Sequence, residues 1–104
     1  MTLKNKEIKE KIRDKNHGIC EKCGKYNWDG HIAHLIAETK TNIKIYGKKI
    51  IDHEYNKRWV CSLDCNDFFN IGNKPKIAER LKNLIILYGD EKMTSKQIDE
   101  LLGI

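Results

Sequence analysis

Four cysteines in two close pairs are the side chains of this chain whose types and spacing point most clearly to chemistry. Cys20 and Cys23 are separated by two residues, and Cys61 and Cys65 by three. Because each pair can reach one ion from a single turn of backbone, the pairs together predict a four-thiolate tetrahedral site of the structural zinc kind. The alternatives are two disulfides or separate buried thiols. We expect the metal, since the charged N-terminal segment is unlike an export signal and disulfides are rare in a reducing cytosol.

The stretch between the two cysteine pairs carries a histidine, His34, in the sequence Ala-His-Leu-Ile at residues 33–36. A neutral imidazole can accept a proton near pH 7, so His34 is a candidate general base. A packed or solvated histidine without a chemical role is the alternative. A metal ion held by the cysteines would fix the chain around this stretch.

Length and charge fit a small domain that a metal ion helps to stabilise. A chain of 104 residues has room for one domain with a modest core, so an ion that helps to define the fold would add materially to its stability. The 20 Lys and Arg residues outnumber the 15 Asp and Glu residues, for a net charge of +5. This balance favours a polyanionic partner, although a solvated lysine-rich surface gives the same count. With no apolar run long enough to cross a membrane, we expect a cytoplasmic protein with no membrane partner.

Hydrophobic spacing predicts the elements that position the cysteines and the histidine. A first helix is expected to begin with Thr2 or Asn5 as its cap and to end at Gly18, directly before the first cysteine pair. The short apolar run 31–36 predicts a strand, and residues 59–60 predict a second strand that leads into the second pair. The order around the pairs is therefore helix, strand, strand and helix.

The remaining segments predict a connection and three helices. Residues 38–55 indicate a loop or an extra hairpin, because apolar and polar residues alternate there. A short helix is expected from about Asp64, and another begins at Pro75, a residue that suits the first helical position. Thr94 and Gln97 have the spacing of a capping box and predict a short terminal helix.

In order and spacing, these parts together resemble the zinc-containing branch of the HNH endonucleases, also called His-Me finger or ββα-metal endonucleases. The residues that carry the resemblance are the run 11–24 around the first cysteine pair, the run 33–36, Asn56 five residues before Cys61, and Cys65 with Asn66 directly after it. The resemblance covers roughly residues 8–74.

A fold class follows from this resemblance. It implies an α+β fold, namely a small ββα-metal, HNH-like domain that a four-cysteine zinc site staples together and that N- and C-terminal helices flank. The chain 1–104 would be a single domain, with residues 8–74 as the motif core and residues 75–104 as a helical C-terminal extension.

For function, the resemblance implies a metal-dependent endonuclease that hydrolyses phosphodiester bonds in DNA. His34 would be the general base that takes a proton from the attacking water. Asn56 would be a catalytic-site residue that orients the loop and the imidazole by side-chain hydrogen bonds. Asn66, with Asn70 about one turn later, would stand where the family offers ligands to a catalytic Mg²⁺ or Mn²⁺ ion.

One position departs from the family pattern. The residue before the general base is usually a metal-binding aspartate or histidine, and here it is Ala33. Asp64 is a candidate for the missing ligand, whereas His31 would point to the opposite face of the strand from His34. The departure keeps a second function open, which is a catalytically lapsed HNH-fold zinc module that binds nucleic acid or a protein partner.

Basic residues before the second cysteine pair are candidate contacts to phosphate. The residues are Lys48, Lys49, Lys57 and Arg58, and a solvated charged face is the alternative interpretation. The expected partner is DNA, with RNA as an alternative. A domain this small has little surface for reading bases, so strong sequence preference would need a homodimer or a separate targeting protein.

Overall fold

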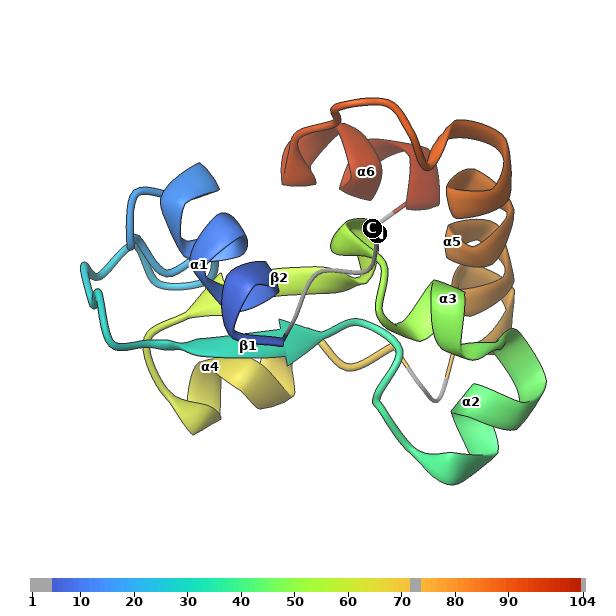
Figure 1. Ribbon diagram of the computed structural model, residues 1–104, viewed down its shortest axis with the longest axis horizontal. Coiled ribbons are helices and arrows are strands. Elements are labelled where there is room, and N and C mark those ends of the chain that lie inside the picture. Colours follow the sequence, from blue (N-terminus) through green and yellow to red (C-terminus); the bar gives the residue numbers. More distant parts are fainter. Residues whose placement is uncertain (1–4, 72–73, 104) are drawn as a thin grey trace.

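A pair of antiparallel strands forms the centre of the structure (Figure 1). The computed structural model describes residues 5–71 and 74–103. Strand β1 spans His31–His34 and strand β2 spans Lys57–Val60, with His31 opposite Val60 and His34 opposite Lys57. The result is a two-stranded sheet within a small mixed α/β domain, and both strands lie where the sequence predicted them.

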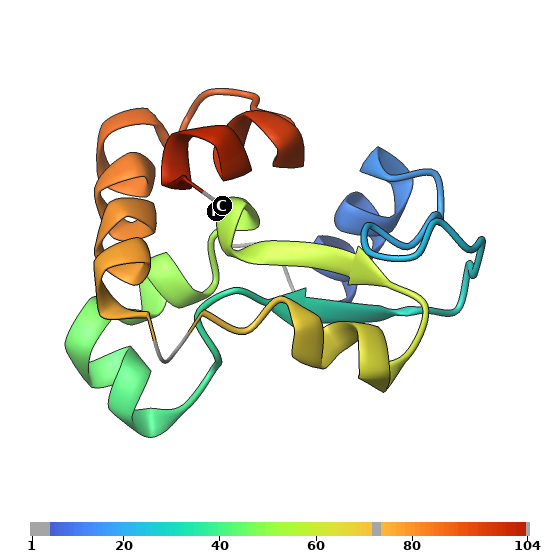
Figure 2. The ribbon, with the colours of Figure 1, turned by 180° about the vertical axis from the view of Figure 1, so that it is seen from behind.

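Helices cover both sides of this sheet. Helix α1, Asn5–Lys15, and helix α4, Leu63–Phe68, lie on opposite sides of it, and helix α6, Ser95–Leu102, approaches β2 from the side away from α4 (Figures 1 and 2). All four residues of β2 are consequently buried. Side chains on either face of this strand are withdrawn from water.

The N-terminal helix ends close to the predicted position. The backbone N–H of Gly18 donates to the carbonyl of Arg13 at 3.0 Å, and Gly18 has φ +70°, a left-handed conformation that suits glycine. Thr2, one of the two predicted caps, lies outside the described residues. The chain therefore turns sharply into the first cysteine pair.

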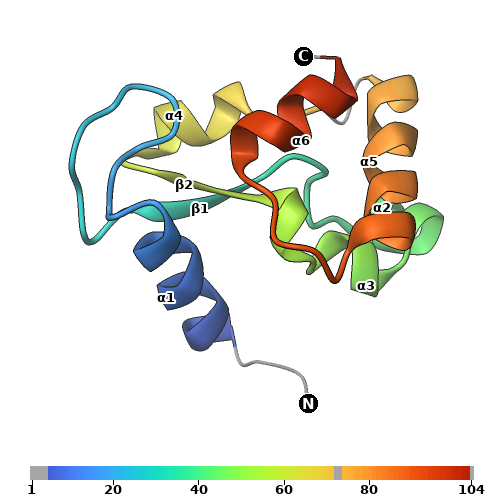
Figure 3. The ribbon, with the colours of Figure 1, turned by 90° about the horizontal axis from the view of Figure 1, so that it is seen from above.

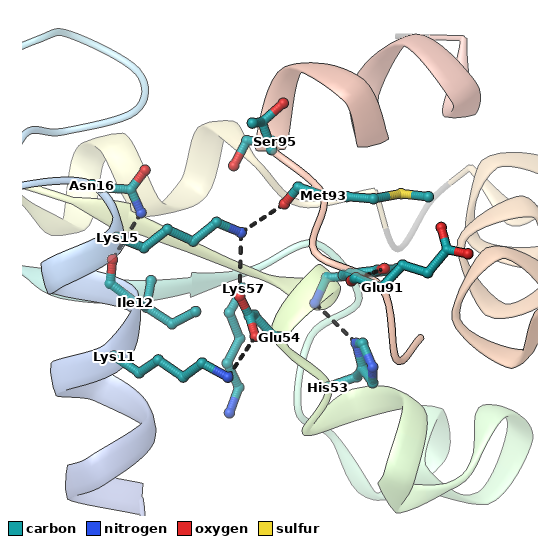
Figure 4. Close-up of polar contacts among 12 residues, drawn as sticks. Lys11, Ile12, Lys15, Asn16, His53, Glu54, Lys57, Glu91, Met93 and Ser95 are labelled. Atoms are coloured by element: carbon teal, nitrogen blue, oxygen red, sulfur yellow. Dashed lines mark hydrogen bonds and ion pairs between the residues drawn. The ribbon is translucent and has the colours of Figure 1, made fainter. Parts of the chain in front are cut away.

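Two lysines of α1 join three segments that are far apart in the sequence (Figure 4). Lys15 donates to the carbonyl of Met93 at 2.8 Å, in the connection before α6, and contacts Glu54 at 3.2 Å. Lys11 contacts the other carboxylate oxygen of Glu54 at 2.9 Å. These contacts tie α1 to Glu54, shortly before β2, and to Met93, in the connection before α6.

The prediction of a loop or hairpin over residues 38–55 was wrong, because this segment is largely helical. Helix α2 spans Lys40–Tyr46, helix α3 spans Lys48–Ile51, and a short 3-10 helix, η1, spans Glu54–Asn56. The hydroxyl of Thr39 accepts the N–H of Asn42 at 3.1 Å and so caps α2, while Gly47 at φ +92° separates α2 from α3. Local capping and packing thus outweigh the alternation of apolar residues.

The C-terminal helices follow their sequence signals. Helix α5 spans Pro75–Tyr88, with the proline in its first turn. The capping box of Thr94 and Gln97 is present at the start of α6. Figure 3 shows α5 beside α2 and α3, at the end of the molecule away from α1. None of the helices in the described part of the chain is long and apolar enough to cross a membrane.

Two groups of buried side chains form the interior. The smaller group packs Ala33 and Val60 of the sheet against Cys20 and Cys65. The larger group joins the chain after β1, α3, η1, α5 and α6, and its buried members are Leu35, Ile36, Ile50, Ile51, Tyr55, Ile71, Ala78, Leu81, Leu84, Ile85, Ile98 and Leu102. The C-terminal helices therefore complete the main core.

Candidate functional site

The four cysteine sulfurs converge at one end of the sheet. One Sγ atom from each of Cys20, Cys23, Cys61 and Cys65 lies within 4.8 Å of all the others. Cys23 and Cys61 are 3.4 Å apart at sulfur, Cys61 and Cys65 are 3.8 Å apart, and all four cysteines are free of disulfide bonds. Four sulfurs at about 2.3 Å from one tetrahedral ion would be about 3.8 Å from each other. The cluster could therefore hold a metal ion such as zinc.

Two tight backbone turns create this cluster. The N–H of Gly24 donates to the carbonyl of Cys20 at 3.0 Å, Gly24 has φ +78°, and the N–H of Cys23 points at the Cys20 sulfur at 3.5 Å. On the other side, the N–H of Cys65 donates to the hydroxyl of Ser62 at 3.3 Å as α4 begins. Each turn brings its own pair of sulfurs together.

Two thiols of the cluster, those of Cys20 and Cys61, differ strongly in acidity. Burial raises the pKa of Cys20, but hydrogen bonds from the backbone N–H groups of Cys23, Cys61 and Lys22 outweigh it and bring the pKa down to about 6. Hydrogen bonding to Cys23, followed by burial, raises the pKa of Cys61 to about 12. The Cys20 sulfur is thus readily ionised, and a divalent cation would replace the proton of Cys61.

A second group of polar residues lines a hollow of about 180 Å³ beyond the other end of β1. Its lining residues are His34, Ala37, Glu38, Asn66 and Asn70. His34, Asn66 and Asn70 were predicted from the sequence as site residues, and the structure brings all three to one cavity. The cavity could contain several water molecules, each of which takes up about 30 Å³ in the liquid.

Hydrogen bonds between segments hold this cavity in shape. The N–H of Ile71 donates to the carbonyl of Leu35 at 2.8 Å, which ties the chain after α4 to the chain after β1. The side-chain amide of Asn66 donates through Nδ2 to the carbonyl of Ile32 at 3.3 Å. The bond to β1 does not involve Oδ1, which is the atom of the Asn66 amide that metal ions prefer.

His34 is in a state suited to accepting a proton. Its side chain is 24% exposed, and Nε2 is buried without a hydrogen bond to any described residue. Burial lowers the pKa of His34, the Lys57 ammonium lowers it further, and the Glu38 and Asp52 carboxylates partly oppose both effects. The imidazole is therefore neutral near pH 7.

Asn56 is fully buried and acts on the backbone around the site. Its Oδ1 accepts the N–H of Ile36 at 2.7 Å, and its Nδ2 donates to the carbonyls of Ile36 at 3.0 Å and Ile51 at 2.9 Å. These bonds fix the chain two residues after His34, as the predicted role in orienting the loop requires. The hydrogen bonds described for the Asn56 side chain all go to backbone atoms. Asn56 is therefore a positioning residue.

The sequence did not point to Glu38, although this residue lines the same cavity. Its carboxylate Oε2 lies 4.0 Å from His34 Nε2. Neither Asp64 nor His31, the two residues considered for the ligand missing at Ala33, lines the cavity, and Ala33 itself packs among the cysteines and apolar residues. In the sequence, Glu38 stands out only by its position four residues after the candidate base. Its place beside His34 depends on the turn of the chain after β1.

The four basic residues proposed as phosphate contacts have different environments. Lys48 and Lys49 are exposed, and Lys48 forms an ion pair with Asp52 at 3.1 Å that solvent screens. Lys57 is only 8% exposed, and burial lowers its pKa.

Arg58 requires a correction. It is 1% exposed, donates to the carbonyl of Tyr55 at 3.1 Å and pairs with Asp99 of α6 at 2.9 Å. Its Nε lies 3.9 Å from the carboxylate of Glu21, within the first cysteine pair. A guanidinium enclosed by two carboxylates holds the fold together, so the expected phosphate contact at Arg58 is not supported.

The chain has no match among the protein-family models, curated proteins and solved structures with which it was compared. Its function is therefore inferred from its own residues and their geometry.

Proposed function

We propose that this protein is a metal-dependent endonuclease of the HNH type that hydrolyses phosphodiester bonds in DNA. The observation that supports it most is the common cavity of His34, at the end of β1, with Asn66 and Asn70, in α4 and directly after it. A candidate general base and two candidate oxygen donors thus face one space that could admit a phosphate group. Such a convergence of a base with cation-binding groups is typical of hydrolytic sites.

In this proposal His34 takes a proton from the attacking water. The oxygen of that water attacks phosphorus, and the bond from phosphorus to the leaving oxygen breaks. The lowered pKa of His34 keeps the imidazole unprotonated at neutral pH, so it is in the form that can accept the proton. Asn56 holds the backbone after His34 and so fixes the direction of the imidazole.

The oxygen-rich donors of the cavity fit a hard divalent cation. When bound there, Mg²⁺ or Mn²⁺ would neutralise the scissile phosphate and stabilise the leaving oxygen. Asn66 and Asn70 would offer amide oxygens, which are weaker donors than carboxylates. The residues of this chain would therefore hold the cation loosely until the DNA phosphate adds its own oxygens.

We infer that the cysteine cluster holds zinc in a structural role. Four thiolates fill a tetrahedral shell, so no coordination position remains for water or substrate. Cys20 and Cys65 pack against buried residues of the sheet, and none of the four cysteines lines the cavity of His34. An ion there would join the turn between α1 and β1, which carries Cys20 and Cys23, to Cys61, directly after β2, and to Cys65, in α4.

Exposed Lys48 and Lys49, together with the net charge of +5, support contact with a nucleic-acid backbone. DNA is the expected substrate, and RNA is the alternative. We retain a homodimer or a targeting protein as the source of any sequence preference, since the domain itself is small.

A binding module that has lost catalysis is the second candidate function, and one observation favours it. Ala33 is fully buried beside the cysteines, so position 33 offers no ligand to the cavity. Such a module would bind nucleic acid or a protein without cleaving it.

Nicking of a supercoiled plasmid separates the two functions. Zinc-loaded wild type should nick with Mg²⁺ or Mn²⁺ and not with EDTA, whereas His34→Ala should lose nicking and keep its zinc, fold and DNA affinity. His31→Ala is the matched control, because His31 is exposed on the same strand and does not line the cavity. Wild type that nicks no faster than His34→Ala with either cation would support the binding module instead.

A further inference from the structure

We propose that Glu38 supplies the carboxylate ligand of the catalytic cation, in place of the acidic residue that position 33 lacks. This inference rests on the proposed function, because it gives Glu38 a role in that reaction. It also explains how the site could work with an alanine directly before the general base.

The donor set of the cavity makes Glu38 the natural ligand. Among the described residues that line it, Asn66 and Asn70 offer neutral amide oxygens and His34 an imidazole, and Glu38 alone carries a carboxylate. Hard divalent cations such as Mg²⁺ and Mn²⁺ prefer carboxylate oxygens to these groups. A cation in the cavity would therefore be held chiefly by Glu38.

Glu38 and His34 lie next to each other at the cavity. Glu38 Oε2 and His34 Nε2 are 4.0 Å apart, which is longer than a hydrogen bond. His34 Nε2 is buried and has no hydrogen-bond partner in the described part of the chain, so a turn of the exposed Glu38 side chain would let a water molecule on the cation reach it. The two side chains are thus placed to act on the same water.

Hydrogen bonds hold the backbone around Glu38. The carbonyl of Ala37 accepts the N–H of Thr39 at 2.9 Å and the side-chain amide of Asn42 at 3.0 Å. Thr39 in turn caps α2. Glu38 therefore stands on a rigid turn between β1 and α2, and its side chain, which is 52% exposed, remains accessible to a hydrated cation.

Position 33 could not take over this role without cost. Ala33 is fully buried against Cys20, Val60 and Cys65. A carboxylate there would lose its hydration and lie beside the thiolates. The carboxylate on the turn after β1 avoids both problems.

Binding of Mn²⁺ alone to the zinc-loaded protein tests the proposal without relying on cleavage. Mn²⁺ should broaden the NMR signals of the Asn66 side-chain amide and of the backbone near His34. Glu38→Gln should weaken this binding at least about tenfold, since even outer-shell partners of metal ligands contribute that much. Glu38→Asp should retain part of the affinity, and Glu100→Gln, an exposed change on α6, should leave it unchanged.

Two results would overturn the proposal. One is Glu38→Gln binding Mn²⁺ as tightly as wild type, even if its pH–rate profile shifts, because Glu38 would then only pair with His34. The other is wild type that shows no Mn²⁺-dependent broadening around the cavity. Failure of the proposed function is a separate outcome: Glu38-dependent Mn²⁺ binding without plasmid nicking would leave the ligand role intact and remove the nuclease activity.

Discussion

Asn56→Ala should destabilise the protein strongly, because this one side chain satisfies three buried backbone groups. The substitution removes the bonds to the N–H and carbonyl of Ile36 and to the carbonyl of Ile51. Each bond contributes about 0.5–1.5 kcal/mol, and each buried group left without a partner adds to the loss. We expect a loss of about 3 kcal/mol or more, out of a total stability of roughly 5–15 kcal/mol.

Thermal unfolding of the zinc-loaded protein, followed by circular dichroism, measures this loss. A change of about 3 kcal/mol corresponds to a fall in Tm of roughly 12–24 °C for a domain near this size. Asn42→Ala is the matched control, because it removes a single side-chain bond, to the carbonyl of Ala37, and should cost about 1 kcal/mol. If Asn56→Ala is no less stable than Asn42→Ala and yet cannot nick DNA, Asn56 acts chemically and the positioning role is refuted.

Four further outcomes are expected. Cys65→Ser should lower the zinc content, measured by elemental analysis, below one ion per chain. It should also reduce the Tm more than any histidine substitution, since structural zinc contributes directly to folding. An unchanged Tm would contradict a structural ion. Arg58→Leu should cost roughly 3 kcal/mol in urea unfolding, because it leaves two acidic partners without their cation, and should spare DNA affinity. Lys48→Glu with Lys49→Glu should have the opposite pattern, with weaker and less salt-dependent binding by fluorescence anisotropy; equal DNA affinity of both variants would argue against this surface. Burial lowers the pKa of His53, and the ring accepts one backbone N–H and contacts a carbonyl. The contribution of His53 to stability should therefore be complete above about pH 6.5 and fall as the pH drops through the lowered pKa. Urea unfolding between pH 8 and pH 5.5 should therefore depend less on pH in His53→Gln, and parallel curves would contradict this.

Elements with strong local signals could be predicted from the sequence. Pro75 and the pair Thr94 and Gln97 each fix a helix start through their own backbone chemistry, and both helices begin there. The cysteine pairs likewise carry their geometry in their spacing, and their sulfurs meet. By contrast, α2 and α3 are short, and packing of their apolar residues against the core stabilises them as helices.

Residues whose role depends on the tertiary fold could not be placed in this way. Lys57 and Arg58 were both predicted to contact phosphate, which requires exposed side chains. Elements on both sides of β2 bury both residues. Glu38 joins Asn66 and Asn70 only because the chain after β1 is tied to the chain after α4, a contact between distant segments that no local pattern encodes.

Chemical rescue of His34→Ala by imidazole tests the central claim most directly. Removing the side chain enlarges a cavity of about 180 Å³ at the proposed reaction centre, and free imidazole could enter it and accept the proton that His34 would take. We predict that His34→Ala does not nick plasmid DNA with Mg²⁺ alone and that nicking returns in proportion to added imidazole, with the zinc content unchanged. Mg²⁺-dependent nicking by His34→Ala at the wild-type rate without imidazole, or no nicking by wild type, would contradict a nuclease that uses His34 as its base.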